Sequence, residues 1–183
     1  MTNPKPKPVT GPVSRIHVCS LAAVPDTVTT VGATHLMTVI NAQTEVETPA
    51  IIGVGRHLKV AVNDISIPQD GLVHPRHDHI EEILRFARDW DHSGPLVVHC
   101  WAGISRSTAA TFITLCALNE DGVEARIARS IRQNSKTATP NALMVSIADD
   151  ILGRRGRMVD AIAEIGQGQI AMVGDPFSLP SRF

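Results

Sequence analysis

The chain has 183 residues with 17 basic and 18 acidic side chains, a formal net charge of −1 and 43% hydrophobic residues. This length is enough for one domain with a substantial core, and the near-neutral charge argues against a nucleic-acid partner. No apolar run reaches the roughly 18 residues of a membrane span, so we expect no membrane partner either.

Cysteine usage indicates the compartment. The chain has three cysteines, an odd number, which favours a reducing environment over a disulfide framework. The proline-rich N-terminus lacks the apolar segment of a signal peptide. We therefore predict a cytoplasmic protein, with Cys19 and Cys116 in its core because both lie in apolar stretches.

Composition divides the chain into three parts. Residues 1–13 predict a mobile, proline-rich lead, and residues 14–165 predict a single domain without an internal linker. Residues 166–183 include Pro176 and Pro180 and predict a loosely structured tail.

Strand and helix patterns alternate along the first half, and helices dominate the second. Apolar runs predict strands at residues 16–21, 36–40, 58–62 and 96–98, and 3.6-residue periodicity or start signals predict helices at 25–31, 78–90, from 106, at 123–134, from 140 and at 158–165. This order predicts an α/β fold with a central, mostly parallel sheet and helices on both faces. Open sheets of this kind bind ligands at the carboxyl end of a central strand.

The most informative stretch is LVVHCWAGISRST at residues 96–108. A short apolar strand leads into Cys100, and Arg106, six positions later, opens the next helix. A loop between a strand and a helix N-terminus points backbone N–H groups inward, and these bind anions and stabilise a thiolate. An arginine fork can hold two phosphate oxygens. The spacing therefore predicts a site in which Cys100 attacks a bound phosphate.

Neighbouring residues support this chemistry. Gly103 lies mid-loop, where a tight turn favours positive φ and a side chain would crowd the anion. His99 can orient the cysteine, and Ser107 can donate a hydrogen bond to the departing thiolate.

The run His-Cys-x-Ala-Gly-x-Ser-Arg-Ser at residues 99–107 resembles the signature of the cysteine-dependent protein tyrosine phosphatases, closest to their dual-specificity branch. The likeness extends over residues 16–151 and implies the phosphotyrosine protein phosphatase fold, a phospho-cysteine intermediate and no cofactor. Asn141, in a Thr-Pro-Asn run, resembles a Ser-Pro-Asn element of that branch and is expected to brace the loop. The phosphate-binding loop would comprise Trp101, Ala102, Gly103, Ile104, Ser105 and Arg106.

The leaving oxygen needs a proton, which a carboxylic acid on a nearby loop can supply. The family places this acid some thirty-odd residues before the cysteine, just past a strand. Asp64 lies 36 positions before Cys100 and directly follows a predicted strand, which favours it. Asp70, 30 positions before, is the alternative, although its Asp-Gly pair is also a common turn.

The histidines near residue 78 do not predict a metal site, because His77 and His79 are two positions apart and diverge on a helix. The loop's variable positions are also uncharged, whereas relatives that act on polyphosphoinositides tend to carry lysines there. We expect a phosphatase without metal or cofactor, acting on phosphotyrosine or phosphoserine/threonine in proteins. The alternatives are a phosphatase for a small non-protein phosphomonoester (a lipid, nucleotide or RNA end) and a catalytically silent module that binds phosphate or another oxyanion.

Overall fold

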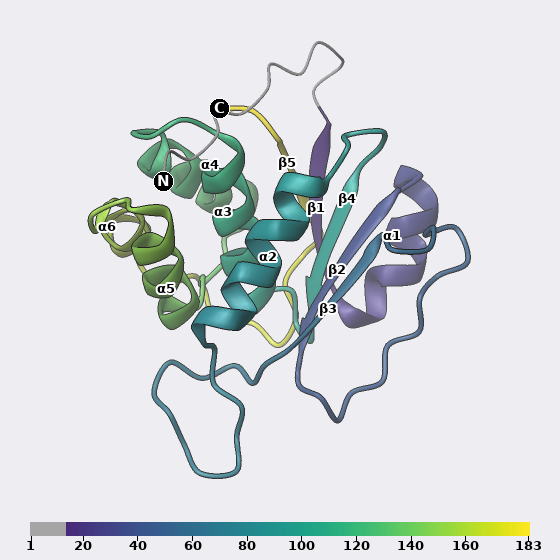
Figure 1. The fold of residues 1–183 in the computed structure, drawn as a ribbon, viewed down its shortest axis with the longest axis horizontal. Helices are drawn as coiled ribbons and strands as arrows, with labels where there is room; N and C mark the ends of the chain where they lie inside the picture. The colour runs from purple at the N-terminus through teal and green to yellow at the C-terminus, as the bar shows by residue number, and fades with distance from the viewer. Residues whose placement is uncertain (1–13) are drawn as a thin grey trace.

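The computed structural model describes residues 14–183, so the predicted lead at residues 1–13 lies outside the described residues. A five-stranded sheet runs through the molecule in the order β3-β2-β4-β1-β5 (Figure 1). Its members are β1 (Arg15–Ser20), β2 (His35–Ile40), β3 (His57–Ala61), β4 (Leu96–Cys100) and β5 (Phe177–Pro180). The first four are mutually parallel and only β5 is antiparallel, pairing with β1. The predicted mostly parallel sheet is confirmed.

Helices cover both faces of the sheet, as predicted (Figure 1). A 3-10 turn, η1 (Leu21–Ala23), leads into α1 (Val24–Val31), which packs on one face. The other side carries α2 (His77–Asp89), α3 (Arg106–Leu118), α4 (Glu124–Asn134), α5 (Ala142–Leu152) and α6 (Arg157–Ile165). Among residues 14–183, no helix has the length and apolar character to span a membrane.

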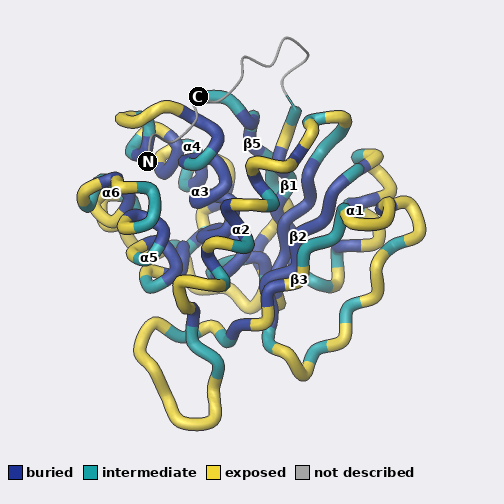
Figure 2. The backbone as a smooth tube through the Cα atoms, viewed as in Figure 1, coloured by how far each residue is buried: buried dark blue, intermediate teal, exposed yellow. Residues whose placement is uncertain are grey.

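The helix α3 is apolar on nearly every side because it lies inside the core. Phe112, Ile113 and Leu115 of α3 are fully buried between the sheet and the outer helices. Figure 2 shows this burial along α3 and the central strands, with the exposed residues in the long loops that follow β2 and β3. A buried strand and a buried helix therefore hold the two ends of the signature loop.

The sequence-based expectation of a loosely structured tail is wrong for residues 177–183. Leu179 of β5 pairs with Ile16 of β1 and is fully buried. After the strand, the Asn119 side chain donates a hydrogen bond to the Ser181 carbonyl and accepts one from the Phe183 N–H. A four-residue strand ending in proline has too little periodicity to be predicted, whereas the open edge of β1 supplies its pairing partner.

Replacing Leu179 with alanine is expected to lower the free energy of unfolding by about 2–4 kcal/mol, because it empties a fully buried site. Urea denaturation measures the change. Met172→Ala is the matched control, since Met172 is 92% exposed in the same C-terminal segment and its truncation should cost little. Equal stability of the Leu179 variant and wild type would contradict the role of β5.

Candidate active site

The signature loop connects the last residue of β4, Cys100, to the first residue of α3, Arg106. Its carbonyl groups face outward: Leu21 and Gly174 N–H groups donate to the carbonyls of residues 101 and 102, at 3.2 and 2.9 Å. Thr139 and Asn141 N–H groups donate to the carbonyls of residues 104 and 105, at 3.0 and 3.4 Å. In a trans peptide the N–H points opposite to the C=O, so the N–H groups of residues 102, 103, 105 and 106 face the inside of the loop.

This arrangement makes an anion cradle. The N–H groups of residues 101–105 donate no hydrogen bond to any described residue. They lie at the N-terminus of a 13-residue helix, where the helix dipole also favours negative charge. The predicted strand–loop–helix context is therefore present at the predicted residues.

Gly103 has the positive φ that the sequence predicts, but the close contact it avoids is with β1 and not with the anion. Its φ is +75°, and an added Cβ would lie 2.8 Å from the Cys19 carbonyl carbon and 2.9 Å from the Ser20 nitrogen. These contacts are with the backbone of β1, which cannot move aside as a side chain can. Glycine is thus required both by the turn and by the close approach of the loop to β1.

The structure brings the cysteine and the serine of the signature together. Cys100 is 1% exposed, and its Sγ lies 3.2 Å from the Ser107 Oγ. The hydroxyl is therefore close enough to donate to a thiolate. Ser107 is fully buried, so this geometry is fixed by the first turn of α3.

Arg106 lies at the end of the loop, and one of its N–H donors makes no hydrogen bond within the described residues. Its Nη1 donates to the Val62 carbonyl at 2.9 Å, which anchors the guanidinium to the end of β3. Its Nε is buried and has no hydrogen-bond partner among the described residues. A buried, unpaired donor of permanent positive charge beside inward-facing amides suits a bound oxyanion.

Asp64 lies at this loop. One carboxylate oxygen accepts hydrogen bonds from the Ser105 hydroxyl at 2.7 Å and the Asn141 side-chain amide at 3.0 Å, and the other lies 3.8 Å from the Arg106 Nε. Asp70 is exposed further along the same loop, and no hydrogen bond or ion pair joins it to the described residues of the signature. The geometry favours the first of the two predicted acids.

Comparison with known proteins agrees with this geometry. Residues 64–139 match the protein-tyrosine phosphatase family model. Over these residues the chain resembles the cysteine-dependent protein tyrosine phosphatases, as its signature motif predicts. The fold resembles DUSP15, with a TM-score of 0.53 and 16% identity over 82% of this chain and 89% of that one. It also resembles the PTP-2 phosphatase of Cydia pomonella, with a TM-score of 0.51 and 16% identity over 74% and 84% of the two chains. None of the curated proteins compared with the chain matches it in sequence.

Behind the signature loop runs a chain of hydrogen bonds that the sequence did not suggest. His99 Nε2 lies 2.6 Å from the Thr38 hydroxyl, which lies 2.7 Å from His57 Nε2. His57 Nδ1 lies 2.7 Å from the Thr48 hydroxyl. The other nitrogen of His99 lies 3.4 Å from the Cys100 carbonyl.

The direction of these bonds follows from the carbonyl, which can only accept. If His99 Nδ1 donates to Cys100, its Nε2 must accept from Thr38, and Thr38 in turn accepts from His57 Nε2. His57 Nδ1 then accepts from Thr48. Burial lowers the pKa of both His57 and His99 to about 4, so both rings are neutral near pH 7, as this order of donors requires.

The two other cysteines, Cys19 and Cys116, are buried thiols. Burial raises the pKa of the Cys19 thiol to about 11 and raises that of Cys116 further. Both are therefore protonated thiols near neutral pH, which agrees with their predicted place in the core.

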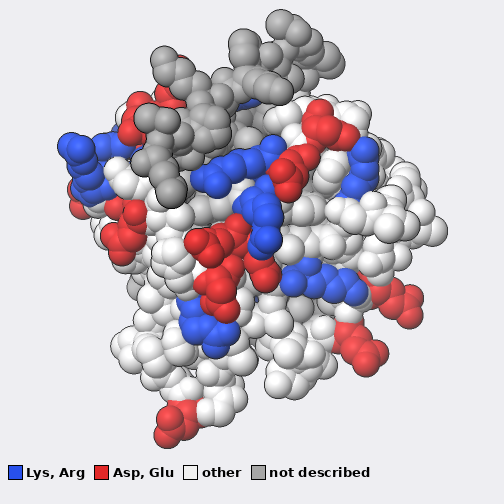
Figure 3. All heavy atoms as spheres, in the orientation of Figure 1, with Lys and Arg blue, Asp and Glu red and all other residues white. Residues whose placement is uncertain are grey.

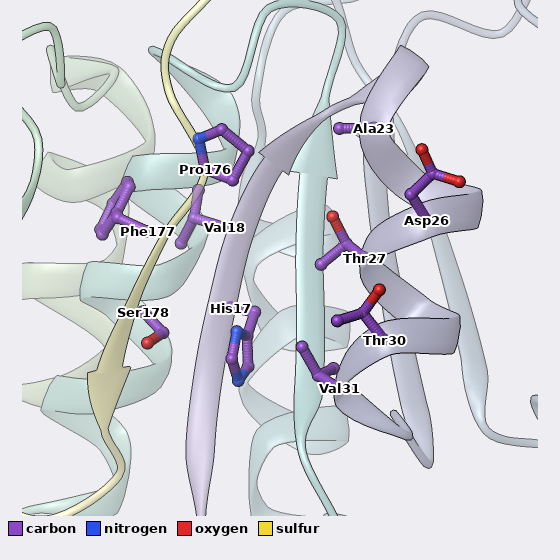
Figure 4. A pocket seen from close by; sticks show the side chains of 10 residues that line it. All are labelled: His17, Val18, Ala23, Asp26, Thr27, Thr30, Val31, Pro176, Phe177 and Ser178. Atoms are coloured by element: carbon purple, nitrogen blue, oxygen red, sulfur yellow. The ribbon is translucent and has the colours of Figure 1, made fainter.

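A hollow of about 460 Å³ lies beside β1, between α1 and β5 (Figure 4). Figure 4 shows His17 on β1 and Thr27 and Thr30 on α1 beside it. Neither Cys100 nor Arg106 lines this hollow, so it takes no part in the site described above. Figure 3 shows acidic side chains near the middle of the face that α2 presents, with basic side chains around them.

Acidification is expected to destabilise the protein between about pH 6.5 and about pH 4 through His57 and His99. Their folded-state pKa values lie below the unfolded value of about 6.5, so the unfolded chain takes up protons first as the pH falls. Urea denaturation near pH 7 and near pH 5 measures the loss. The loss should be smaller in His57→Gln, which cannot titrate, and an identical loss in variant and wild type would contradict this assignment.

Proposed function

We propose that the protein hydrolyses phosphomonoesters through a phospho-cysteine intermediate, with phosphotyrosine or phosphoserine/threonine of proteins as substrate. The observation that carries the proposal is the cradle itself. Inward-facing amides surround the position in front of Cys100, and the buried Arg106 Nε donates no hydrogen bond within the described structure. A phosphate dianion bound by these groups would lie in front of the sulfur that attacks it.

In the first step, the Cys100 thiolate attacks phosphorus and a sulfur–phosphorus bond forms as the bond to the leaving oxygen breaks. The loop amides and Arg106 hold the non-bridging oxygens and stabilise the charge that develops on them. Asp64, in its protonated form, gives its proton to the leaving oxygen, which departs as an alcohol or phenol. Hydrogen bonds from Ser105 and Asn141 fix the orientation of this carboxyl group.

In the second step, water attacks phosphorus and the sulfur–phosphorus bond breaks. Asp64, now ionised, accepts a proton from this water, so the acid of the first step becomes the base of the second. The Ser107 hydroxyl, 3.2 Å from the sulfur, donates a hydrogen bond to the thiolate as it departs. Orthophosphate leaves, the Cys100 thiolate is restored, and the proton that Asp64 gave to the leaving group is replaced by one from water.

The side chains of the loop and the state of the cysteines support a substrate class and a cellular compartment. The uncharged side chains in the loop offer nothing to a polyphosphorylated headgroup, which supports a phosphoprotein substrate. The mechanism needs a reduced Cys100, and all three cysteines are free thiols, which supports action in a reducing compartment such as the cytoplasm. Every step uses groups of the chain itself and water.

The test is hydrolysis of p-nitrophenyl phosphate and of a phosphotyrosine peptide without added metal. Cys100→Ser should abolish both activities. Asp64→Asn should lower kcat on the peptide by about 10²–10⁴-fold, because the general acid is lost, and by less on p-nitrophenyl phosphate, whose leaving group needs less protonation. Asp70→Asn is the matched control on the same loop and should remain close to wild type.

Several outcomes would overturn parts of the proposal. Tight phosphate binding without turnover by wild type would indicate a silent binding module. A panel in which nucleotides or phosphoinositides exceed every phosphopeptide in kcat/KM would indicate a non-protein substrate. A large loss in Asp70→Asn with none in Asp64→Asn would transfer the general acid role to Asp70.

A further inference from the structure

A second hollow, of about 570 Å³, adjoins the candidate active site. Asp64 and Ser105 line it on one side, and these two residues also belong to the wall of the phosphate site. Residues of α6, the pair Gly166 and Gln167 after it, and residues 139–142 at the start of α5 also line the hollow. The hollow is thus continuous with the catalytic loop at the carboxyl group of Asp64.

The lining is mainly apolar and almost uncharged. Asp64 is the only ionisable side chain among the lining residues, and Val159, Ile162 and Ala163 present α6 to the hollow. Val159 is 38% exposed, so part of its side chain is accessible to a ligand. Thr139 and Gln167 add a hydroxyl and an amide group to the lining. Such a lining suits an uncharged, apolar group with polar backbone around it, whereas a second phosphate would find no basic partner there.

The hollow is preformed, because hydrogen bonds tie its walls to one another and to the signature loop. The Arg132 guanidinium donates to the Gly166 carbonyl at 2.9 Å, which fixes the end of α6. The Gly168 N–H donates to the Thr139 hydroxyl at 3.0 Å, and the Thr139 N–H donates to the carbonyl of Ile104 in the loop. A wall held in this way loses little freedom when a ligand binds.

The direction of the leaving group connects the two sites. In an in-line displacement, the leaving oxygen faces away from the attacking sulfur and lies at the general acid. A substituent on that oxygen therefore passes Asp64, where the hollow begins. This step rests on the proposed function, since it takes Asp64 as the acid.

We propose that this hollow is a specificity subsite that binds an apolar side chain next to the phosphorylated residue of a protein substrate. The apolar α6 wall contacts the side chain, and the polar groups of Thr139 and Gln167 lie against peptide backbone. A peptide fits this lining better than a lipid, because a long acyl chain would have to lie over these polar groups as well.

The test uses phosphotyrosine peptides in which Leu or Asn directly precedes or directly follows the phosphotyrosine. Leu and Asn are similar in size and both uncharged, so their comparison isolates apolar contact from repulsion by Asp64. Wild type should favour Leu over Asn by roughly tenfold in kcat/KM at one of the two positions. Ala163→Trp, which fills the hollow from an exposed position on α6, should bring this ratio close to one.

Two further variants keep the result interpretable. Asp160→Trp adds the same side chain to an exposed position of α6 outside the hollow and should retain the wild-type ratio. Val159→Asn, which replaces an exposed apolar lining residue without adding bulk, should lower the ratio several-fold. Activity on p-nitrophenyl phosphate, too small to reach α6, normalises the variants to the integrity of the loop.

The outcomes separate the two proposals. Hydrolysis of p-nitrophenyl phosphate with equal kcat/KM for Leu and Asn peptides at both positions would overturn the subsite and leave the proposed function standing. The same holds if Ala163→Trp retains the preference, or if a phosphorylated lipid loses more activity in that variant than the Leu peptide does. Absence of any wild-type turnover would overturn the proposed function first.

Discussion

The outward orientation of the signature-loop carbonyls is the constraint on which the rest of the site depends. Each carbonyl that accepts a hydrogen bond from outside turns the following N–H group inward. The donors come from segments far apart in the chain: Leu21 after β1, Thr139 and Asn141 before α5, and Gly174 before β5. A loop of five residues between β4 and α3 could not hold this conformation by itself, because its amides face one another and have no internal acceptors.

The conformation of the signature loop also depends on β1, on the end of β3 and on the segment after α6. Gly103 lies against the backbone of β1 at Cys19 and Ser20, and Arg106 is anchored to Val62 at the end of β3. The tail after α6 reaches the loop at Gly174 before it joins the sheet as β5. Stability of the fold and shape of the cradle are therefore linked, and changes in the tail can reach the site without contacting a substrate.

Much of this arrangement could be predicted from the sequence because its cause is local. The apolar run before Cys100, the glycine within the loop and the helix after Arg106 are neighbours in the chain, and together they predict strand, turn and helix. The placement of Asp64 just after a strand was also sufficient to predict that it would lie nearer the site than Asp70. Parallel strands end at the same edge of the sheet, which brings the residue after β3 to the residue after β4.

The remaining features depend on register and tertiary context. Thr38 meets His99 because β2 and β4 pair with these residues opposite each other, and His57 joins them only through the pairing of β2 with β3. Thr38 and His57 do not stand out in the sequence, because neither belongs to a motif. The strand β5 exists because β1 has an open edge, and the apolar wall of α6 becomes a hollow only where residues 139–142 and Asp64 face it.

The central claim is that Cys100 takes phosphate from the substrate inside this cradle. Mass spectrometry of the protein, quenched by rapid denaturation during turnover of p-nitrophenyl phosphate and then digested, tests it most directly. The account predicts one phosphoryl group on the peptide that contains Cys100, in wild type and not in Cys100→Ser. Turnover with the phosphoryl group on another residue, or with none on the protein at any time, would contradict it.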